Sequence, residues 1–189
     1  MEIMLAWKIL VCVWVASEIC LTIATRTRRG SGNVKDRGSM IVIWVTIFLA
    51  IAAGETIRYS MPYQMFNGTR WPTLVAIFVV LAGIALRWTA ILSLGKAFSP
   101  NVAILSNQTI YRKGLYRWVR HPAYTGSLIS FFGLGIQQQN WLAGIAVIAP
   151  ITAAFLYRIH VEEAALNEAF GAEYAEYSRQ TKRLIPGIY

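Results

Sequence analysis

The segment from Tyr116 to Gly126 reads YRWVRHPAYTG and is the most polar and aromatic stretch between long apolar runs. It places two arginines, a histidine and two tyrosines close together. Arginine and histidine side chains bind carboxylates, and aromatic faces bind cationic groups. Such a cluster in a hydrophobic chain is a candidate binding site.

A second polar cluster follows the last apolar run, where the sequence reads YRIHVEEAALNEAFGAEYAEY. Arg158 and Glu162 are four residues apart, so they share one face of a continuous helix, which Leu166 and Phe170 extend. His160 points to another face and is predicted to be non-catalytic. An ordinary intrahelical ion pair followed by an amphipathic helix would give the same pattern, with a stabilisation of only a few tenths of a kcal/mol.

The composition indicates where these clusters must lie. The chain has 189 residues, of which 56% are hydrophobic and 14% are charged, a balance that is typical of membrane proteins. The net charge of +9 on so apolar a chain indicates membrane orientation before nucleic-acid binding, and no nucleic-acid partner is predicted. Cys12 and Cys20 both fall within the first apolar run, where they are predicted to act as small hydrophobes, with no disulfide and no metal site.

The apolar runs predict an all-α, polytopic membrane protein with about five transmembrane helices. Three runs are long enough alone, at about 3–25, 40–58 and 72–95. The fourth region, 123–157, is interrupted by the polar tetrapeptide QQQN at 137–140. This tetrapeptide predicts the tip of a helical hairpin whose two arms are both short for a span. Further helices are expected in the C-terminal tail.

The distribution of lysine and arginine predicts the orientation of the spans. Basic residues gather in 26–37, 96–120 and 158–183, whereas the opposite side carries only Arg58 and Arg70. The positive-inside rule places the three basic regions in the cytoplasm and the N-terminus outside. Both polar clusters then lie at the same cytoplasmic face. The short, compact chain favours a prokaryotic plasma membrane.

Four charged residues lie inside the predicted spans, where charges are expensive and by default indicate function. Lys8 lies near an end and is expected to reach the interface. Glu55 is three residues before Arg58, and the two are expected to pair along one helix face. Glu18 and Arg87 are expected either to pair with each other or to line a polar cavity, and the sequence leaves both alternatives open.

The two clusters together match a ligand that has a carboxylate, ribose hydroxyls and a cationic centre. S-adenosylmethionine has all three, although many other ligands need similar groups. Two alternatives stay open at this point. His121 and His160 are the only histidines and would be the axial ligands of a haem in an electron-transfer protein. The chain would otherwise be a non-enzymatic lipid-binding or assembly factor, in which His121 before Pro122 only starts a helix.

Three segments in this order carry a resemblance to a known family. GLYRWVRHPAYTG, RIHVEEAALNEAFGAEYAEY and the terminal RLIP resemble the isoprenylcysteine carboxyl methyltransferase family, which is related to the integral-membrane phospholipid methyltransferases. The resemblance covers roughly residues 83–189, and the first two spans are matched only in character. It implies a single membrane domain, 1–189, in which 71–189 form the methyltransferase core and 1–70 provide N-terminal spans of uncertain role.

What the resemblance implies chemically is an S-adenosylmethionine-dependent methyltransferase that releases S-adenosylhomocysteine at the cytoplasmic face. The cofactor-binding positions that it implies are Gln108, Thr109, Ile110, Tyr111, Tyr116, His121, Pro122, Ala123, Tyr124 and Glu162. Arg158 corresponds to the substrate-facing arginine, and Arg158 and Glu162 are the predicted catalytic pair. Family members commonly have histidine where this chain has Gln108, whose amide keeps a hydrogen bond but supplies no charge. No metal is implied.

The acceptor is expected to be lipophilic, with membrane lipids as the surrounding partners. A prenylated cysteine carboxylate, a phospholipid amine and a small lipophilic thiol or acid all remain possible, so O-, N- and S-methylation stay open, as does the oligomeric state. A carboxylate needs no general base, and Arg158 would orient it. An amine would have to lose a proton, for which Glu163 or Glu162 is the nearest candidate. Arg117, Lys113 and Arg120 are expected to include solvated charges.

Overall fold

The computed structural model describes residues 2–24, 33–34, 38–61, 69–95, 98, 103–104 and 109–189. Within these residues the helices are α1 (Glu2–Ala24), α2 (Ser39–Ser60), α3 (Trp71–Leu94), α4 (Pro122–Gln137), α5 (Trp141–Phe170) and α6 (Ala172–Gln180). A short 3-10 turn, η2 (Gly114–Arg117), precedes α4, and the two-residue strands β1 (Asn33–Val34) and β2 (Ala103–Ile104) pair antiparallel. The all-α prediction is confirmed.

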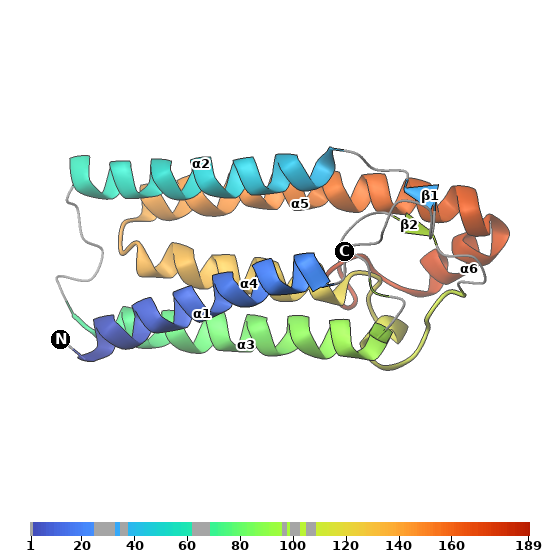
Figure 1. Ribbon diagram of the computed structural model, residues 1–189, viewed down its shortest axis with the longest axis horizontal. Helices are drawn as coiled ribbons and strands as arrows, with labels where there is room; N and C mark the ends of the chain where they lie inside the picture. Colours follow the sequence, from blue (N-terminus) through green and yellow to red (C-terminus); the bar gives the residue numbers. More distant parts are fainter. Residues whose placement is uncertain are drawn as a thin grey trace.

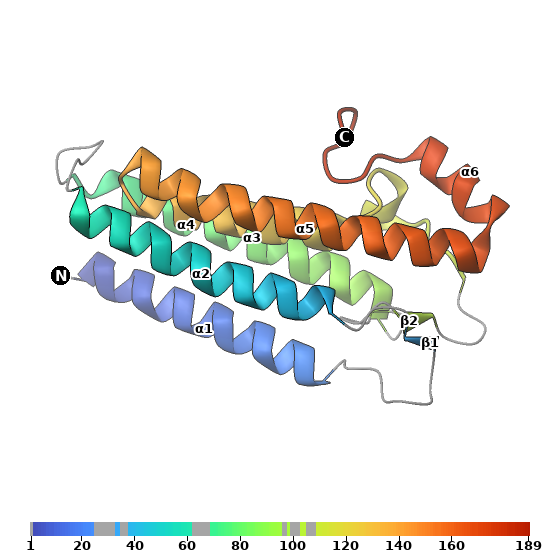
Figure 2. The same ribbon diagram turned by 90° about the horizontal axis from the view of Figure 1, so that it is seen from above.

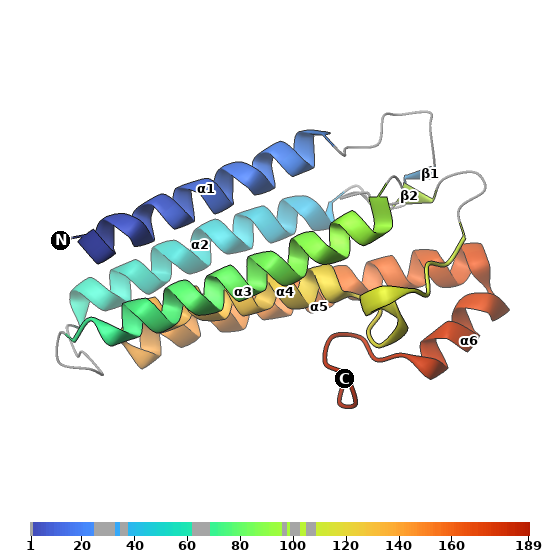
Figure 3. The ribbon, with the colours of Figure 1, turned by 90° about the horizontal axis from the view of Figure 1, so that it is seen from below.

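The five long helices run side by side as an elongated bundle, and α6 folds back at one end (Figures 1 and 2). We call this end, with 114–126 and 158–189, the tail end, and the end with the α4–α5 turn the tip end. The N-terminus lies at the tip end (Figure 1). The helix pairs α3–α4 and α2–α5 pack along their lengths, and α1 contacts α3. Seen from below, α3 lies in front of α4 and α5 (Figure 3).

The helix lengths support a membrane-spanning bundle. Among the described residues, α1, α2, α3 and α5 are long and apolar enough to cross a bilayer. The 16 residues of α4 extend about 24 Å at 1.5 Å per residue, which is less than the roughly 30 Å of a hydrocarbon core. The other arm of the hairpin is longer than expected, because α5 continues unbroken for 30 residues, through Pro150 and past Arg158. Its last turns therefore extend beyond the hydrocarbon core.

The predicted hairpin tip is confirmed at the turn between α4 and α5. Asn140 caps α5, because its Oδ1 accepts hydrogen bonds from the backbone N–H groups of Leu142 at 3.0 Å and Ala143 at 3.1 Å. Its Nδ2 donates to the carbonyl oxygen of Met61 at 2.8 Å, just past the end of α2. The asparagine therefore ends the turn and joins it to α2.

Two glycines allow α3 and α4 to approach closely near the tail end. A Cβ atom at Gly126 would lie 2.6 Å from the carbonyl oxygen of Gly83 and 2.6 Å from the backbone nitrogen of Arg87. Small residues that permit such backbone contact are common where membrane helices pack. The contact brings Arg87 to the first turn of α4, where its Nη1 donates to the carbonyl oxygen of Ala123 at 3.3 Å.

Three of the four charges inside the spans, Glu18, Glu55 and Arg87, form ion pairs. Arg87 Nη2 lies 2.7 Å from Glu18 Oε2, and the two side chains are only 14% and 15% exposed. Both residues also line a cavity between the helices. The two expectations for Glu18 and Arg87, an ion pair and the lining of a cavity, are therefore both met. The expected pair of Glu55 and Arg58 is confirmed at 2.7 Å. Lys8 is exposed, as its predicted position near a helix end requires.

The Glu18–Arg87 pair makes a first prediction. Glu18→Gln is expected to destabilise the protein by about 3 kcal/mol, because it leaves a buried guanidinium without its counter-charge. The double variant Glu18→Gln/Arg87→Met is expected to recover most of that loss, and unfolding in detergent measures both. A double variant that is less stable than the single one would show that the pair contributes more than mutual neutralisation.

Candidate active site

Backbone hydrogen bonds at the tail end hold the residues that follow the second polar cluster against the first cluster. The backbone nitrogen of Arg120 donates to the carbonyl oxygen of Lys182 at 2.7 Å, and that of His121 donates to Arg183 at 3.1 Å. The backbone nitrogen of Lys182 in turn donates to Trp118 at 3.1 Å. The two clusters themselves meet through hydrogen bonds from Tyr124 to Glu162 at 2.7 Å and from Arg120 to Glu163 at 2.9 Å, so their predicted convergence is confirmed.

A sharp turn after α5 brings α6 into place. Gly171 has a φ of 49°, a left-handed conformation that glycine adopts without strain at the end of a helix. α6 then folds back, and the Tyr177 hydroxyl donates to the carbonyl oxygen of Tyr116 at 2.7 Å. Burial raises the pKa of Tyr177 to about 12 and also raises the pKa of Tyr116. Both hydroxyls therefore remain protonated donors at physiological pH.

Tyr124 connects the two residues that the sequence places on one face of the last long helix. Its hydroxyl donates to Glu162 Oε2 at 2.7 Å and accepts from Arg158 Nε at 3.2 Å. Arg158 is only 1% exposed, and its Nη1 also donates to the Ser39 hydroxyl at the start of α2. A guanidinium, a phenol and a carboxylate thus form one partly buried chain between α4 and α5, which the Ser39 hydroxyl extends to α2.

The neighbouring carboxylate, Glu163, has a different environment. Its Oε1 accepts from Arg120 Nε at 2.9 Å and lies 3.3 Å from His121 Nε2, and its Oε2 accepts from Arg183 Nε at 2.9 Å. Because so many positive groups stabilise the ionised form, Glu163 is a weak proton acceptor. Sequence reasoning considered Glu163 only as a base and missed this ion cluster. The available signal was a second carboxylate beside Glu162, facing two basic segments.

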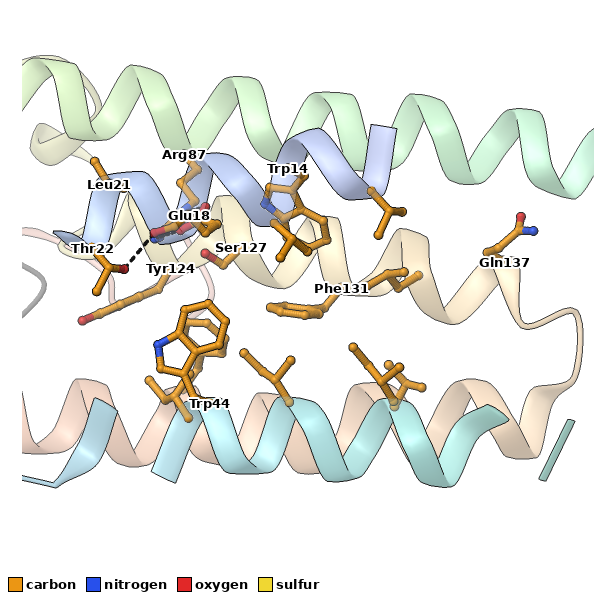
Figure 4. Close-up of a pocket in the computed structure, with 18 of the residues that line it drawn as sticks. Trp14, Glu18, Leu21, Thr22, Trp44, Arg87, Tyr124, Ser127, Phe131 and Gln137 are labelled. Atoms are coloured by element: carbon orange, nitrogen blue, oxygen red, sulfur yellow. Dashed lines mark hydrogen bonds and ion pairs between the residues drawn. The ribbon is translucent and has the colours of Figure 1, made fainter. Parts of the chain in front are cut away.

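A cavity of about 320 Å³ begins at Tyr124 and extends along the bundle between the helices. Its tail end is lined by Tyr124, Ser127 and the Glu18–Arg87 pair, and its tip end by polar residues of the α4–α5 turn. Between them the walls are apolar. Figure 4 shows Trp14, Trp44 and Phe131 between the Tyr124 end and the Gln137 end. Helices α1, α2, α4 and α5 all supply wall residues.

Other predicted cofactor-binding residues surround Tyr124. His121 and Pro122 are buried, with Pro122 at the first position of α4, where its fixed φ favours helix initiation. Ala123 is buried, and the His121 ring stacks on that of Tyr124 with centroids 5.6 Å apart. These four consecutive residues therefore form one compact turn at the start of α4.

The remaining predicted positions lie before η2. Tyr111 packs edge-on against Tyr116, with ring centroids 5.5 Å apart, and Ile110 is half-buried. Thr109 is exposed, and Gln108 lies outside the described residues. The described part of this stretch therefore reaches the site through Tyr111 and Tyr116, which pack against the last turns of α3.

Two of the polar residues that were not assigned to the site, Arg117 and His160, lie on the surface. Arg117 is exposed and stacks over the Trp118 ring at 4.6 Å. His160 is exposed on α5, whereas the His121 ring is buried beside Glu163. Imidazoles in such different settings do not favour a haem held between them. Within the described residues, no three His, Cys, Asp or Glu side chains are grouped to hold a metal ion.

The fold and the site define a polytopic helical membrane protein with a buried ionic site at one end of an apolar cavity. The sequence model of the isoprenylcysteine carboxyl methyltransferase family matches residues 74–168. The chain belongs to this family. The predictions of an integral-membrane protein and of a methyltransferase are thereby confirmed.

The relatives agree over most of the chain. Protein-S-isoprenylcysteine O-methyltransferase A of Arabidopsis thaliana is 26% identical over 91% of this chain and 87% of its own length. Its B counterpart is 30% identical over 71% of each chain. The solved structure of the eukaryotic intramembrane Ras methyltransferase ICMT superposes with a TM-score of 0.61 at 26% identity, covering 81% of this chain and 54% of that one.

Proposed function

We propose that the protein transfers a methyl group from S-adenosylmethionine to the carboxylate of a lipophilic acceptor whose apolar chain lies in the internal cavity. The observation that carries this proposal is the position of Tyr124. Its side chain lines the cavity and also bonds to both Arg158 and Glu162. The relatives' names make a prenylated cysteine the first acceptor to test.

The residues at the tail end have the chemistry that S-adenosylmethionine requires. Glu162 offers a carboxylate to a ribose hydroxyl, and the rings of Tyr116, His121 and Tyr124 offer aromatic faces to a sulfonium. We assign the remaining cofactor contacts to Gln108–Tyr111 and to Pro122–Ala123, as the family resemblance implies. When bound, S-adenosylmethionine supplies an electrophilic methyl group.

The ionic environment favours a carboxylate acceptor over an amine. A carboxylate is already a nucleophile at neutral pH, whereas an amine must first lose a proton. Glu163 is held by Arg120, Arg183 and His121, so it is a weak base. Arg158 bonds to the Tyr124 hydroxyl, and in this proposal its guanidinium orients the acceptor carboxylate. Apolar cavity walls exclude water, and alignment of the reacting groups supplies most of the rate.

The residues that line the cavity support a role for the N-terminal spans. Trp14 of α1 and Met40 and Trp44 of α2 line it together with residues of α4 and α5. We infer that residues 1–70 complete the acceptor site of a single domain, whose core is 71–189. In this proposal the tail end faces the cytoplasm and the N-terminus lies outside, because the basic residues gather at the tail end. The membrane that we propose is a prokaryotic plasma membrane.

Cofactor binding provides the first test. Glu162→Ala and His121→Ala are each expected to weaken S-adenosylhomocysteine binding by about 10-fold or more, the loss of one strong hydrogen bond to a charged or ring group. Calorimetry on the purified protein in detergent measures the affinity. Glu168→Ala, an exposed position on the same helix, is the matched control and should bind like the wild type.

Unchanged affinity in both site variants, with the same melting temperature as the wild type, would contradict this site assignment. The acceptor is tested separately by incubating the protein with labelled S-adenosylmethionine and native membranes and identifying the labelled product. A base-labile methyl ester supports carboxylate methylation. A label on a phospholipid amine or on a thioether would instead assign N- or S-methylation.

A further inference from the structure

The tip end of the cavity contains a buried amide whose oxygen has no partner. Gln138 is 6% exposed, and its Nε2 donates to Glu55 Oε1 at 3.4 Å. An ionised carboxylate only accepts hydrogen bonds, so this contact fixes which end of the amide faces Glu55. The other end, Oε1, is buried without a hydrogen-bond partner, and Gln138 lines the cavity.

The same cavity accounts for most of the unpartnered polar atoms in the described residues. Among the described residues, four buried polar side-chain atoms have no hydrogen-bond partner. Three of these atoms belong to residues that line this cavity: Gln138 Oε1, Gln137 Oε1 and Trp14 Nε1. Buried polar atoms in native proteins are nearly always paired, so orphaned ones indicate a missing ligand or water. Gln137 and Gln138 lie together at the tip end, and Trp14 lies midway along α1 (Figure 4).

The position of Gln138 corresponds to the far end of a long acceptor. Tyr124 lies in the first turn of α4 and Gln138 immediately follows the helix, so they are about 20 Å apart at 1.5 Å per residue. An extended chain advances roughly 1.2 Å per bond, so about 16 bonds cover this distance. This is close to the length of a farnesyl chain joined through sulfur to a short carboxylic acid. The last carbons of such a chain would lie beside Gln138.

We propose that Gln138, held by Glu55, forms a polar subsite that binds a hydroxyl group at the distal end of the acceptor's chain. A hydroxyl donates to the free amide oxygen and can accept from water or from a neighbouring donor. A wholly apolar chain end would leave the amide oxygen unpaired. The identity of the cavity as the acceptor site rests on the proposed function, but binding at the subsite does not require methyl transfer.

The test compares two probes that differ by one oxygen. One is S-farnesyl-3-thiopropionic acid, and the other is the same molecule with a hydroxyl on the terminal methyl carbon. Their affinities are measured by tryptophan fluorescence in one detergent, for the wild type and for Gln138→Met. The preference of each variant is its affinity for the hydroxylated probe divided by its affinity for the other probe. We expect this ratio to be about 10-fold greater for the wild type than for Gln138→Met, the value of one good hydrogen bond to a buried group.

Each probe partitions into the detergent to the same extent whichever variant is present. The effect of partitioning on the measured affinities therefore cancels when the preferences of two variants are compared. Gln180→Met is the matched control, because Gln180 is exposed on α6 and lies outside the cavity, and it should keep the wild-type preference. Equal preference in the wild type and Gln138→Met would overturn the subsite and assign the free amide oxygen to water. Selective binding of the hydroxylated probe without methylation of either probe would support the subsite and contradict the proposed transfer to a carboxylate.

Discussion

Arg158→Ala is expected to lower the rate of methyl transfer by about 10²- to 10³-fold, the usual loss when a preorganised charged contact to the reacting group is removed. The affinity for S-adenosylhomocysteine should stay within about threefold of the wild type, because in our proposal Glu162 and the aromatic rings hold the cofactor. Transfer to a labelled lipophilic acid and calorimetric cofactor binding, measured on the same preparation, separate the two effects.

Arg158 is buried between three helices, so the stability of the variant must be measured as well. Arg158→Lys keeps the charge but not the planar fork, and it should recover only part of the rate. Arg179→Ala, at an exposed position on α6, is the control and should retain full turnover. A well-folded Arg158→Ala protein with wild-type turnover would rule out the proposed substrate role.

Glu163→Gln is expected to destabilise the tail end by about 3 kcal/mol, because removing one member of a buried charge cluster leaves its partners uncompensated. The side chains of Glu163 and Arg120 are each only 9% exposed. Arg183 is 37% exposed, so water screens it and it should add little to the loss. Thermal unfolding in detergent gives the loss of stability, and limited proteolysis reports whether the residues after α6 have detached.

Glu176→Gln serves as the matched control, because Glu176 pairs with Arg179 on the solvent side of α6. It should leave both the melting temperature and the proteolysis pattern unchanged. If Glu163→Gln were as stable as this control and equally resistant to protease, Glu163 would not be what fixes the tail to the segment before α4.

Periodicity and charge were sufficient to predict the elements of the fold. The polar tetrapeptide QQQN marks the hairpin tip because a bilayer core tolerates no such run, and Asn140 proves to cap the second arm. Pairs within one helix, such as Glu55 and Arg58, follow from spacing alone. The length of α5 was less predictable, because Arg158 resembles the end of a span although the helix continues to Phe170.

Contacts between distant segments could not be read from spacing. Glu162 and Glu163 are adjacent and chemically identical, yet one bonds to Tyr124 and the other to Arg120 and Arg183. Which carboxylate takes which partner depends on how the tail packs after Gly171, a three-dimensional result with no local signature. The unpartnered amide oxygen of Gln138 could not be predicted from the sequence either, because a glutamine at a hairpin tip is expected to face water.

The shortness of α4 determines how deep in the membrane the proposed active site lies. A helix of about 24 Å whose last turn is at one boundary of a 30 Å core cannot carry its first turn past the other boundary. The turn from His121 to Tyr124 is therefore recessed below the lipid headgroups, while α5 extends beyond them. An acceptor anchored in the bilayer can reach this depth by lateral diffusion within its leaflet. Its apolar chain therefore does not have to enter water during a catalytic cycle.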